Sequence, residues 1–164
     1  MNREKGFTLV ELLVVIAIVA VLAGAVLLAI NPLSMLQKSR DAKRLSDLET
    51  VSKAMTLAMT DGELTLGVLG PFTSASPSTQ AVDGTGWVKF VVPTDKTGLA
   101  KWIPALPLDP LNVAPNVYTF QSTATGFEIS AVLEHTDNAT KMKVDGGDGD
   151  GVYEVGTDLK IITH

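Results

Sequence analysis

The feature that most constrains this chain is an apolar run from Leu12 to Ile30, which contains only Leu, Val, Ile, Ala and Gly24. In a helix, such a run rises roughly 28 Å, close to the thickness of the hydrocarbon core of a bilayer. A helix of a soluble domain normally has a polar face, whereas this one is apolar on every side. The run therefore predicts a membrane span, or a helix that other helices surround completely.

The residues before the run distinguish it from an ordinary anchor. Glu11 lies at its edge, where a carboxylate costs on the order of a few kcal/mol unless it meets a cation or stays near the headgroups. Gly6 separates the charged leader, residues 1–5, from the aromatic Phe7. A secretory signal peptide would have small residues and a cleavage site after the run, but Asn-Pro-Leu occupies positions 31–33.

The segment Lys5-Gly6-Phe7-Thr8-Leu9-Val10-Glu11, followed by an apolar helix, resembles the class III signal of type IV pilins and type II secretion pseudopilins. In that superfamily the signal reads basic leader, Gly, Phe-Thr-Leu-(Ile/Val)-Glu and then an apolar helix. Every position matches, and the resemblance covers about the first 30 residues of the chain.

The resemblance implies that a prepilin peptidase cuts between Gly6 and Phe7 and that the new amine of Phe7 is N-methylated. The helix would first hold the subunit in the bacterial inner membrane, as a single pass with a cytoplasmic N-terminus. It would then form the core of a periplasmic or extracellular helical filament, built with an assembly platform and minor pilins. In that filament Glu11 would neutralise the Phe7 amine of a neighbour, because a buried carboxylate that lacks its partner is destabilising.

The whole chain predicts an α+β, pilin-like fold in which a long N-terminal α-helix, transmembrane and then amphipathic, packs on a small antiparallel β-sheet. The predicted parts are a leader at 1–6, a hydrophobic transmembrane and filament-core helix at 7–31, the amphipathic half of the helix at 32–61, and a loop with a sheet at 62–164. Pro32 is expected to kink the helix, since strong helix formers follow it.

The amphipathic half shows apolar residues at three- and four-residue spacing, which predicts a stripe that packs on the sheet. Charged residues supply the polar positions of this half of the helix. The stripe consists of Leu45, Leu48, Val51 or Ser52, Met55, and Ala58 or Met59, and the charged positions are Arg40, Lys43, Arg44, Asp47, Glu49 and Lys53.

Short runs of β-branched and aromatic residues beyond the helix predict an antiparallel sheet, after a loop-like segment at 63–86. In the run from Phe127 to Leu133, inward-facing residues alternate with outward-facing ones. The side chains of Phe127 and of every second residue after it are expected to face the core, and those of Glu128 and of every second residue after it are expected to face away from it. The predicted strands are Trp87–Val92, Val117–Gln121, Phe127–Leu133 and Tyr153–Val155.

The segment Leu106-Pro107-Leu108-Asp109-Pro110 resembles a Leu-Pro-x-Asp-Pro segment of major-pseudopilin-like proteins. Its prolines preset turns and are incompatible with a helix or a central strand. We interpret it as a rigid loop packed by Trp102, Leu106 and Leu108 rather than as a docking surface.

An acidic, glycine-rich segment contains Asp145, Asp148 and Asp150. Closely spaced carboxylates in a flexible loop can supply the six to eight oxygens that calcium requires, although the spacing is not that of an EF-hand. Some major pseudopilins bind calcium near their sheet, so the resemblance also favours such a site. The alternative is a solvated turn without an ion, and no other cofactor is required.

Composition argues against several other functions. The net charge of −5 does not suit a nucleic-acid-binding protein. His135 and His164 are the only histidines and there is no cysteine, so nothing positions a hydrolytic site and too few ligands exist for a zinc site. His164 is expected to be mobile, and Asn138 fits a glycosylation acceptor pattern.

These observations predict a structural filament subunit and not an enzyme. The alternative is a membrane-anchored exported binding protein that does not polymerise. Glu11 separates the two, because a simple anchor gains nothing from a carboxylate at that position. The sequence leaves open a pilus or a secretion pseudopilus, and the segment at 106–110 and the acidic loop favour the major-pseudopilin type.

Overall fold

The computed structural model describes residues 6–75 and 78–164, apart from the side chains of residues 28–30. The chain divides into two compact units, residues 1–36 and residues 37–164, and each is described by itself. We call the second one the globular unit. Apart from Gly6, the predicted leader lies outside the described residues.

Helix α1 spans Leu9–Ile30 and ends at Asn31, which has a left-handed φ of 44°. The side-chain oxygen of Asn31 accepts a hydrogen bond from the backbone N–H of Ser34, 3.3 Å away. Asn31 therefore ends one helix and caps the next, and Pro32 takes the first position of α2, where no N–H donor is needed. The interruption predicted at Asn31 and Pro32 is confirmed.

Helix α2 spans Pro32–Thr60, and within the globular unit one face of it packs into the hydrophobic core. The predicted apolar stripe is confirmed at most of its positions, although Leu45 is only half-buried. The buried apolar residues of α2 are Leu48, Val51, Ala54, Met55 and Ala58.

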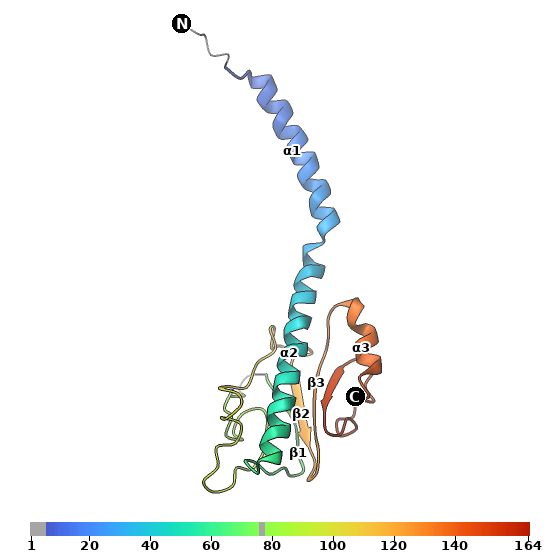
Figure 1. Ribbon diagram of the computed structural model, residues 1–164. Coiled ribbons are helices and arrows are strands. Elements are labelled where there is room, and N and C mark those ends of the chain that lie inside the picture. The colour runs from blue at the N-terminus through green and yellow to red at the C-terminus, as the bar shows by residue number, and fades with distance from the viewer. Residues whose placement is uncertain (1–5, 76–77) are drawn as a thin grey trace. The chain divides into compact units, whose positions relative to one another are not determined.

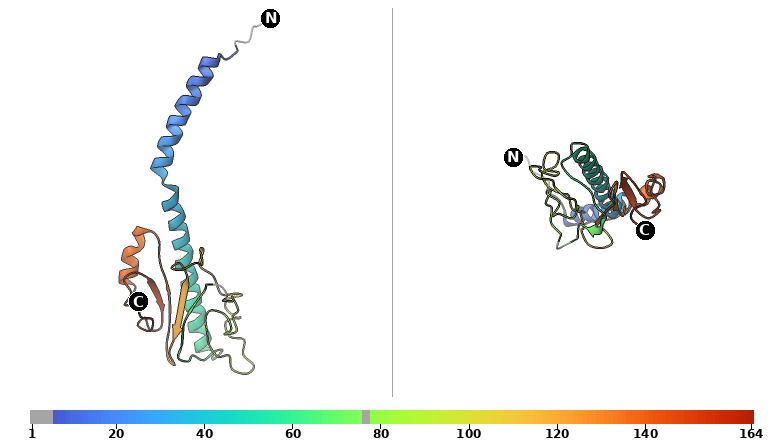
Figure 2. Two further views of the ribbon diagram at one scale, coloured as in Figure 1. Left: turned by 180° about the vertical axis from the view of Figure 1, so that it is seen from behind. Right: turned by 90° about the horizontal axis from the view of Figure 1, so that it is seen from below.

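The sheet has four antiparallel strands in the order β1-β2-β3-β4. Figures 1 and 2 show α2 lying along the sheet, with β4 and the short helix α3 at one edge. Phe120 of β2 is paired with Ile129 of β3, and both are fully buried against α2. The α+β, pilin-like fold is thereby confirmed. The strands are β1 Leu69–Thr73, β2 Tyr118–Ser122, β3 Phe127–Ala131 and β4 Tyr153–Gly156, and the short helices are η1 Thr136–Asn138 and α3 Ala139–Val144.

Two predictions about the strands were wrong. The run Trp87–Val92 is not a strand, because only Val91 pairs, in a single bridge to Thr65. Trp87 is buried, and its indole N–H donates to the carbonyl of Pro107 at 2.9 Å, so this run is apolar because it fills the core. Strand β1 instead lies in the segment predicted to be a loop, where Gly and Pro obscure its pattern.

The alternation predicted for β3 is confirmed, but the half-buried sheet expected from it was wrong, because all five residues of β3 are buried. Phe127 and Ile129 face the core shared with α2. Glu128 faces the other way, where the backbone N–H groups of Ile161 and Ile162 donate to its carboxylate. The C-terminal segment thus covers the face of the sheet that the alternating sequence pattern predicted to be exposed to solvent.

The loop predicted from the prolines at 106–110 is confirmed as a packed segment. Leu106 is fully buried, and Trp102 and Leu108 pack against the same core. Trp87 and Tyr118 also meet there, with ring centroids 5.8 Å apart. The long connection between α2 and β2 therefore contributes to the core, and it brings Asp109 towards α2.

Candidate functional site

The start of α1 forms a reciprocal capping arrangement between Thr8 and Glu11. The hydroxyl of Thr8 accepts from the N–H of Glu11 at 3.2 Å, and the carboxylate of Glu11 accepts from the N–H of Thr8 at 2.9 Å. The Thr8 hydroxyl also donates to the same carboxylate oxygen at 2.7 Å. This capping box satisfies backbone donors at the helix end, and the Thr-x-x-Glu spacing in the sequence was a signal for it.

The predicted processing residues, Gly6 and Phe7, precede this cap, and the side chain of Phe7 is 83% exposed. A side chain at Gly6 would meet no atom within 4 Å. The place of the predicted cut is therefore accessible within this chain, and neither residue serves its packing. Cleavage and methylation at these residues stay predictions.

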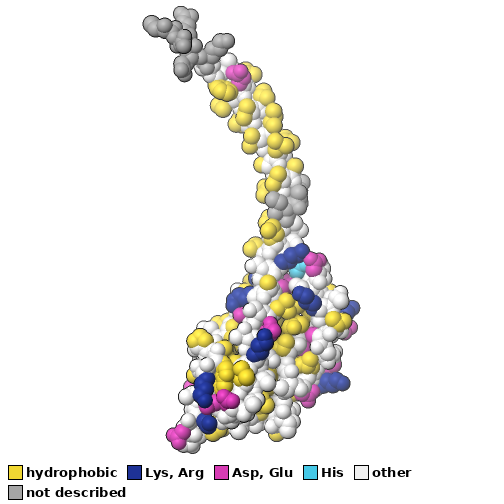
Figure 3. Space-filling model, in the orientation of Figure 1, with side chains coloured by type: hydrophobic (Ala, Val, Ile, Leu, Met, Phe, Trp, Pro, Cys, Tyr) yellow, Lys and Arg dark blue, Asp and Glu magenta, His cyan; other side chains and the backbone are white. Residues whose placement is uncertain are grey.

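The rest of α1 has no side-chain partner from this chain at the positions described. Its residues from Leu9 to Leu27 are all exposed, and Figure 3 shows hydrophobic side chains along the helix. It is part of the one described helical segment that is long and apolar enough to cross a membrane. Small residues at Ala17, Ala20 and Gly24 would allow another helix to approach closely.

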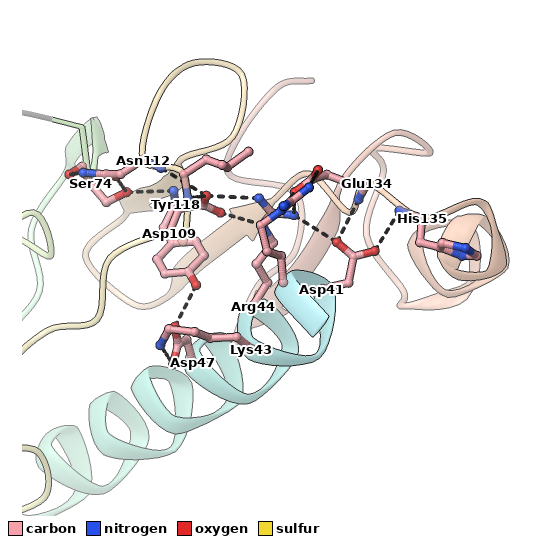
Figure 4. Close-up of polar contacts among 12 residues, drawn as sticks. Asp41, Lys43, Arg44, Asp47, Ser74, Asp109, Asn112, Tyr118, Glu134 and His135 are labelled. Atoms are coloured by element: carbon pink, nitrogen blue, oxygen red, sulfur yellow. Dashed lines mark hydrogen bonds and ion pairs between the residues drawn. The ribbon is translucent and has the colours of Figure 1, made fainter. Parts of the chain in front are cut away.

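A second cluster of polar residues lies inside the globular unit, around Arg44 of α2 (Figure 4). Arg44 is fully buried. Its Nε lies 2.6 Å from Asp109 Oδ2 and its Nη2 lies 3.1 Å from Asp109 Oδ1, which makes a two-bond contact. Its Nη1 donates to Asp41 at 2.9 Å and to Glu134 at 2.6 Å. Arg44 therefore joins α2 to two distant loops.

The carboxylates around Arg44 are themselves held in place. Asp41 accepts from the backbone N–H groups of Glu134 and His135, each at 2.8 Å. Arg40 contacts Glu134 through two bonds of 2.7 and 2.5 Å. Arg44 and the three carboxylates around it therefore each have several partners, which is the condition under which buried ion pairs persist.

Burial and hydrogen bonding within the network shift the pKa values of several of its residues. Burial alone would lower the pKa of Arg44, but its bonds to Asp109 and Glu134 raise that pKa above its ordinary value. The hydrogen bond from Arg40 lowers the pKa of Glu134 to about 2. Burial raises the pKa of Tyr118, whose hydroxyl donates to Asp47 at 2.8 Å. At neutral pH Arg44 and Glu134 are therefore both charged.

Arg44, which was assigned to the polar positions outside the apolar stripe, is buried, and the reason can be read from the spacing. Positions 41, 44, 48, 51 and 55 recur at three and four residues, so Asp41 and Arg44 continue the buried stripe towards the start of α2. A charged residue on a buried stripe signals a buried ion pair. Its partner, Asp109, could not be identified from spacing along the chain.

The structure does not bring Asp145, Asp148 and Asp150 together as a metal-binding group. The carboxylate of Asp145 accepts from the backbone N–H groups of Gly147 and Glu154, at 3.0 and 2.9 Å. Asp148 and Asp150 are exposed. Asp145 thus shapes the loop through backbone contacts, and calcium binding stays a prediction.

Each of the two histidines lies against acidic groups. The ring of His135 accepts from the N–H of Asp137 at 3.1 Å and caps η1. His164, expected to be mobile, places its Nε2 3.4 Å from Glu128 and 3.4 Å from Glu154. The amide nitrogen of Asn138, which glycosylation would modify, donates to Asp41 at 2.8 Å.

These features define the class of the protein: an exposed apolar N-terminal helix with a carboxylate in its first turn, and a helix packed on a four-stranded antiparallel sheet, are pilin-like. Residues 1–27 match the family described as the prokaryotic N-terminal methylation motif. The chain thus carries the class III signal of type IV pilins and pseudopilins, a signal of structural subunits and not of an enzyme class. The motif and helix are consistent with inner-membrane anchoring. Searches of curated proteins and of solved structures found no match.

Proposed function

We propose that this chain is a structural subunit of a type IV pilus or a type II secretion pseudopilus, polymerised through its N-terminal helix. The observation that carries the proposal is the match to the methylation motif at residues 1–27, directly ahead of the exposed apolar part of α1. The motif implies processing by a prepilin peptidase and assembly into a filament. The partners are then other copies of the chain, an assembly platform and minor pilins.

The same features support a subunit that is first inserted in the membrane and is then incorporated into a filament. Before assembly, α1 spans the inner membrane once with its N-terminus in the cytoplasm, and after processing the subunit enters a periplasmic or extracellular filament. In lipid, apolar burial gives helices no preference for one another, so close packing at small residues becomes important. The stretch from Ala17 to Ala25, which includes Ala20, Ala23 and Gly24, supplies such residues.

Glu11 has a defined role in this proposal. Among the residues that the structure describes, its carboxylate bonds only to Thr8, a neutral residue of the same turn. In a dry filament core that carboxylate needs a cation, and the Phe7 amine of a neighbouring subunit supplies it. The segment Leu106–Pro110 favours the major-pseudopilin type through its resemblance alone, since Asp109 in it already serves the packing of the globular unit.

Mass spectrometry of the protein isolated from its host tests the processing step. We expect an N-terminal Phe7 that carries a methyl group, and assembled subunits that retain Met1 would contradict the proposal. A Gly6→Val variant is the matched control, because the signal requires glycine before the cut. Since a side chain at Gly6 meets nothing within 4 Å, this variant should fold normally and keep its leader.

A further inference from the structure

Two buried carboxylates and a histidine meet on the face of the sheet opposite α2. Glu128 of β3 and Glu154 of β4 are 0% and 1% exposed. Ser130 is paired with Glu154, so Glu128 lies diagonally across from Glu154 on the same face. The Nε2 atom of His164 lies 3.4 Å from Oε1 of each glutamate.

Backbone groups hold both carboxylates by their second oxygens. Glu128 Oε2 accepts from the N–H groups of Ile161 and Ile162 at 2.8 and 2.9 Å. Glu154 Oε2 accepts from the N–H of Gly149 at 2.9 Å. These contacts orient the two Oε1 atoms towards His164, as outer partners orient the ligands of metal ions.

One oxygen of this arrangement lacks a hydrogen-bond partner. Glu154 Oε1 is buried and has no hydrogen bond within the described part of the chain. An unsatisfied buried polar atom is costly, and a buried carboxylate more so. The position of this oxygen therefore calls for a proton or a cation at the point where the three side chains meet.

The surrounding loop leaves room for this arrangement at two glycines. A Cβ at Gly147 would lie 2.1 Å from Glu154 Oε2, and a Cβ at Gly149 would lie 2.7 Å from the ring of His164. Any side chain at either position would displace a member of the cluster. The side chain of His164 is 18% exposed, so an ion can reach the cluster from solvent.

We propose that Glu128, Glu154 and His164 form a binding site for a single zinc-like divalent transition-metal ion. The three candidate ligand atoms lie within 4.8 Å of one another. A tetrahedral site with bonds of about 2.0–2.1 Å has ligand-to-ligand distances of about 3.3–3.4 Å. The two distances from His164 Nε2 agree with that value, and a water molecule would complete the site.

The donor set favours this kind of ion over calcium. Calcium takes six to eight oxygen ligands at about 2.3–2.6 Å, whereas imidazole suits zinc and its neighbours. The scarcity of histidine and cysteine argued against zinc at the level of sequence, but here two glutamates take their place.

The proposed ion would fasten the end of the chain to the sheet. Glu128 and Glu154 belong to β3 and β4, while His164 follows the segment that covers them. The chain has no cysteine, so a disulfide cannot supply such a link. Metal binding at a site assembled only in the folded state adds directly to the stability of that state.

The test is a zinc titration of the full-length chain in detergent, after treatment with a chelator. We expect one zinc ion per chain, and a rise in the temperature at which tryptophan fluorescence reports unfolding. Glu154→Gln and His164→Gln should each weaken zinc binding by at least about tenfold, the lower end of the effect of losing even an outer partner. Cobalt bound to the unmodified chain should show the strong visible bands of a four-coordinate ion.

Asp148→Asn is the matched control, because this acid belongs to the same loop and is exposed. We expect it to bind zinc as the unmodified chain does. His164→Gln should still fold, because the side chain of His164 is partly exposed. The proposal would be overturned if the unmodified chain bound zinc no more tightly than this variant. Loss of zinc binding in Asp148→Asn would do the same, by assigning the ion to the acidic loop.

Discussion

The two units of the chain differ in which side chains they bury and which they expose. In α1 the leucine, valine and isoleucine side chains described are exposed, whereas in the globular unit Arg44, Asp41 and Asp109 are buried. Each buried charge has at least two partners within the same unit. The charges of this network are thus paired within the globular unit, whereas exposed apolar side chains such as those of α1 favour apolar surroundings.

This contrast indicates where each unit obtains its stability. The buried network and the core of the globular unit are intramolecular, so substitutions there should change unfolding. In the proposed function, side chains of α1 contact lipid or other subunits, so substitutions there should leave the unfolding of the globular unit unchanged. Both tryptophans, Trp87 and Trp102, lie in the globular unit, and their fluorescence therefore reports on it alone.

The largest effect is expected from Arg44→Ala. Removing this guanidinium leaves the carboxylates of Asp41 and Asp109 buried without their cation, which typically costs about 3–5 kcal/mol of unfolding free energy. Urea denaturation of the full chain in detergent, followed by tryptophan fluorescence, measures it. Lys53→Ala is the matched control on the same helix, because its ion pair with Glu49 is exposed and worth about 0.5 kcal/mol or less.

A second variant of the network shows whether the loss comes from the ion pair. Asp109→Ala should also be strongly destabilising, and the double variant with Arg44→Ala should lose less than the sum of the two single changes. Strictly additive losses would contradict the description of Arg44 and Asp109 as one unit.

A matched pair of leucines sharpens the comparison between the units. Leu48 is 0% exposed and Leu13 is 56% exposed. Leu48→Ala should cost about 2–5 kcal/mol in the same denaturation experiment, because it leaves a cavity between α2 and the sheet. Leu13→Ala should change the result by less than about 0.5 kcal/mol. Equal effects from the two variants would remove the distinction drawn here.

A smaller effect is expected from pH. The pKa of Glu134 is lowered from 4.5 to about 2 by Arg40. A carboxylate whose pKa is lower in the folded state stabilises the fold at pH values above its unfolded pKa. Stability should therefore fall as the pH drops from about 4.5 towards 2. In Glu134→Gln the chain should be less stable at pH 7, and its stability should decline less on acidification; an equally steep decline would contradict this role.

Much of the fold was predictable from local patterns. The apolar run predicted α1, the stripe through Leu48 and Met55 predicted α2, and hydrophobic β-forming runs predicted β2, β3 and β4. Each of these elements is dictated by residues close together in the chain. Strand β1 was missed because Gly70 and Pro71 interrupt its pattern.

The contacts between distant segments were not predictable in the same way. Asp109 meets Arg44 across 65 positions of sequence, and the C-terminal segment covers Glu128 from 33 positions away. Such pairs depend on how the loops close over the core, and the periodicity of the sequence does not predict loop conformation. The methylation motif was recognisable because it is a continuous stretch of sequence, whereas the cluster around His164 exists only in the folded chain.

In the proposed filament, Glu11 serves assembly through its charge. Glutamine at position 11 can still close the capping box with Thr8, but it cannot neutralise an amine. Glu11→Gln therefore removes the charge and keeps the cap, while Thr8→Val removes the cap and keeps the charge. Glu11→Ala removes both.

The most direct test measures filament yield, membrane content and leader processing of these three variants in the host. We expect all three to enter the membrane, since removing a carboxylate does not hinder insertion. Glu11→Gln and Glu11→Ala should lose filaments, because the Phe7 amine is then buried without its partner at each subunit. This costs about 3–5 kcal/mol per subunit and raises the critical concentration about a hundredfold or more. Thr8→Val should retain them. Normal filaments from Glu11→Gln would contradict the account.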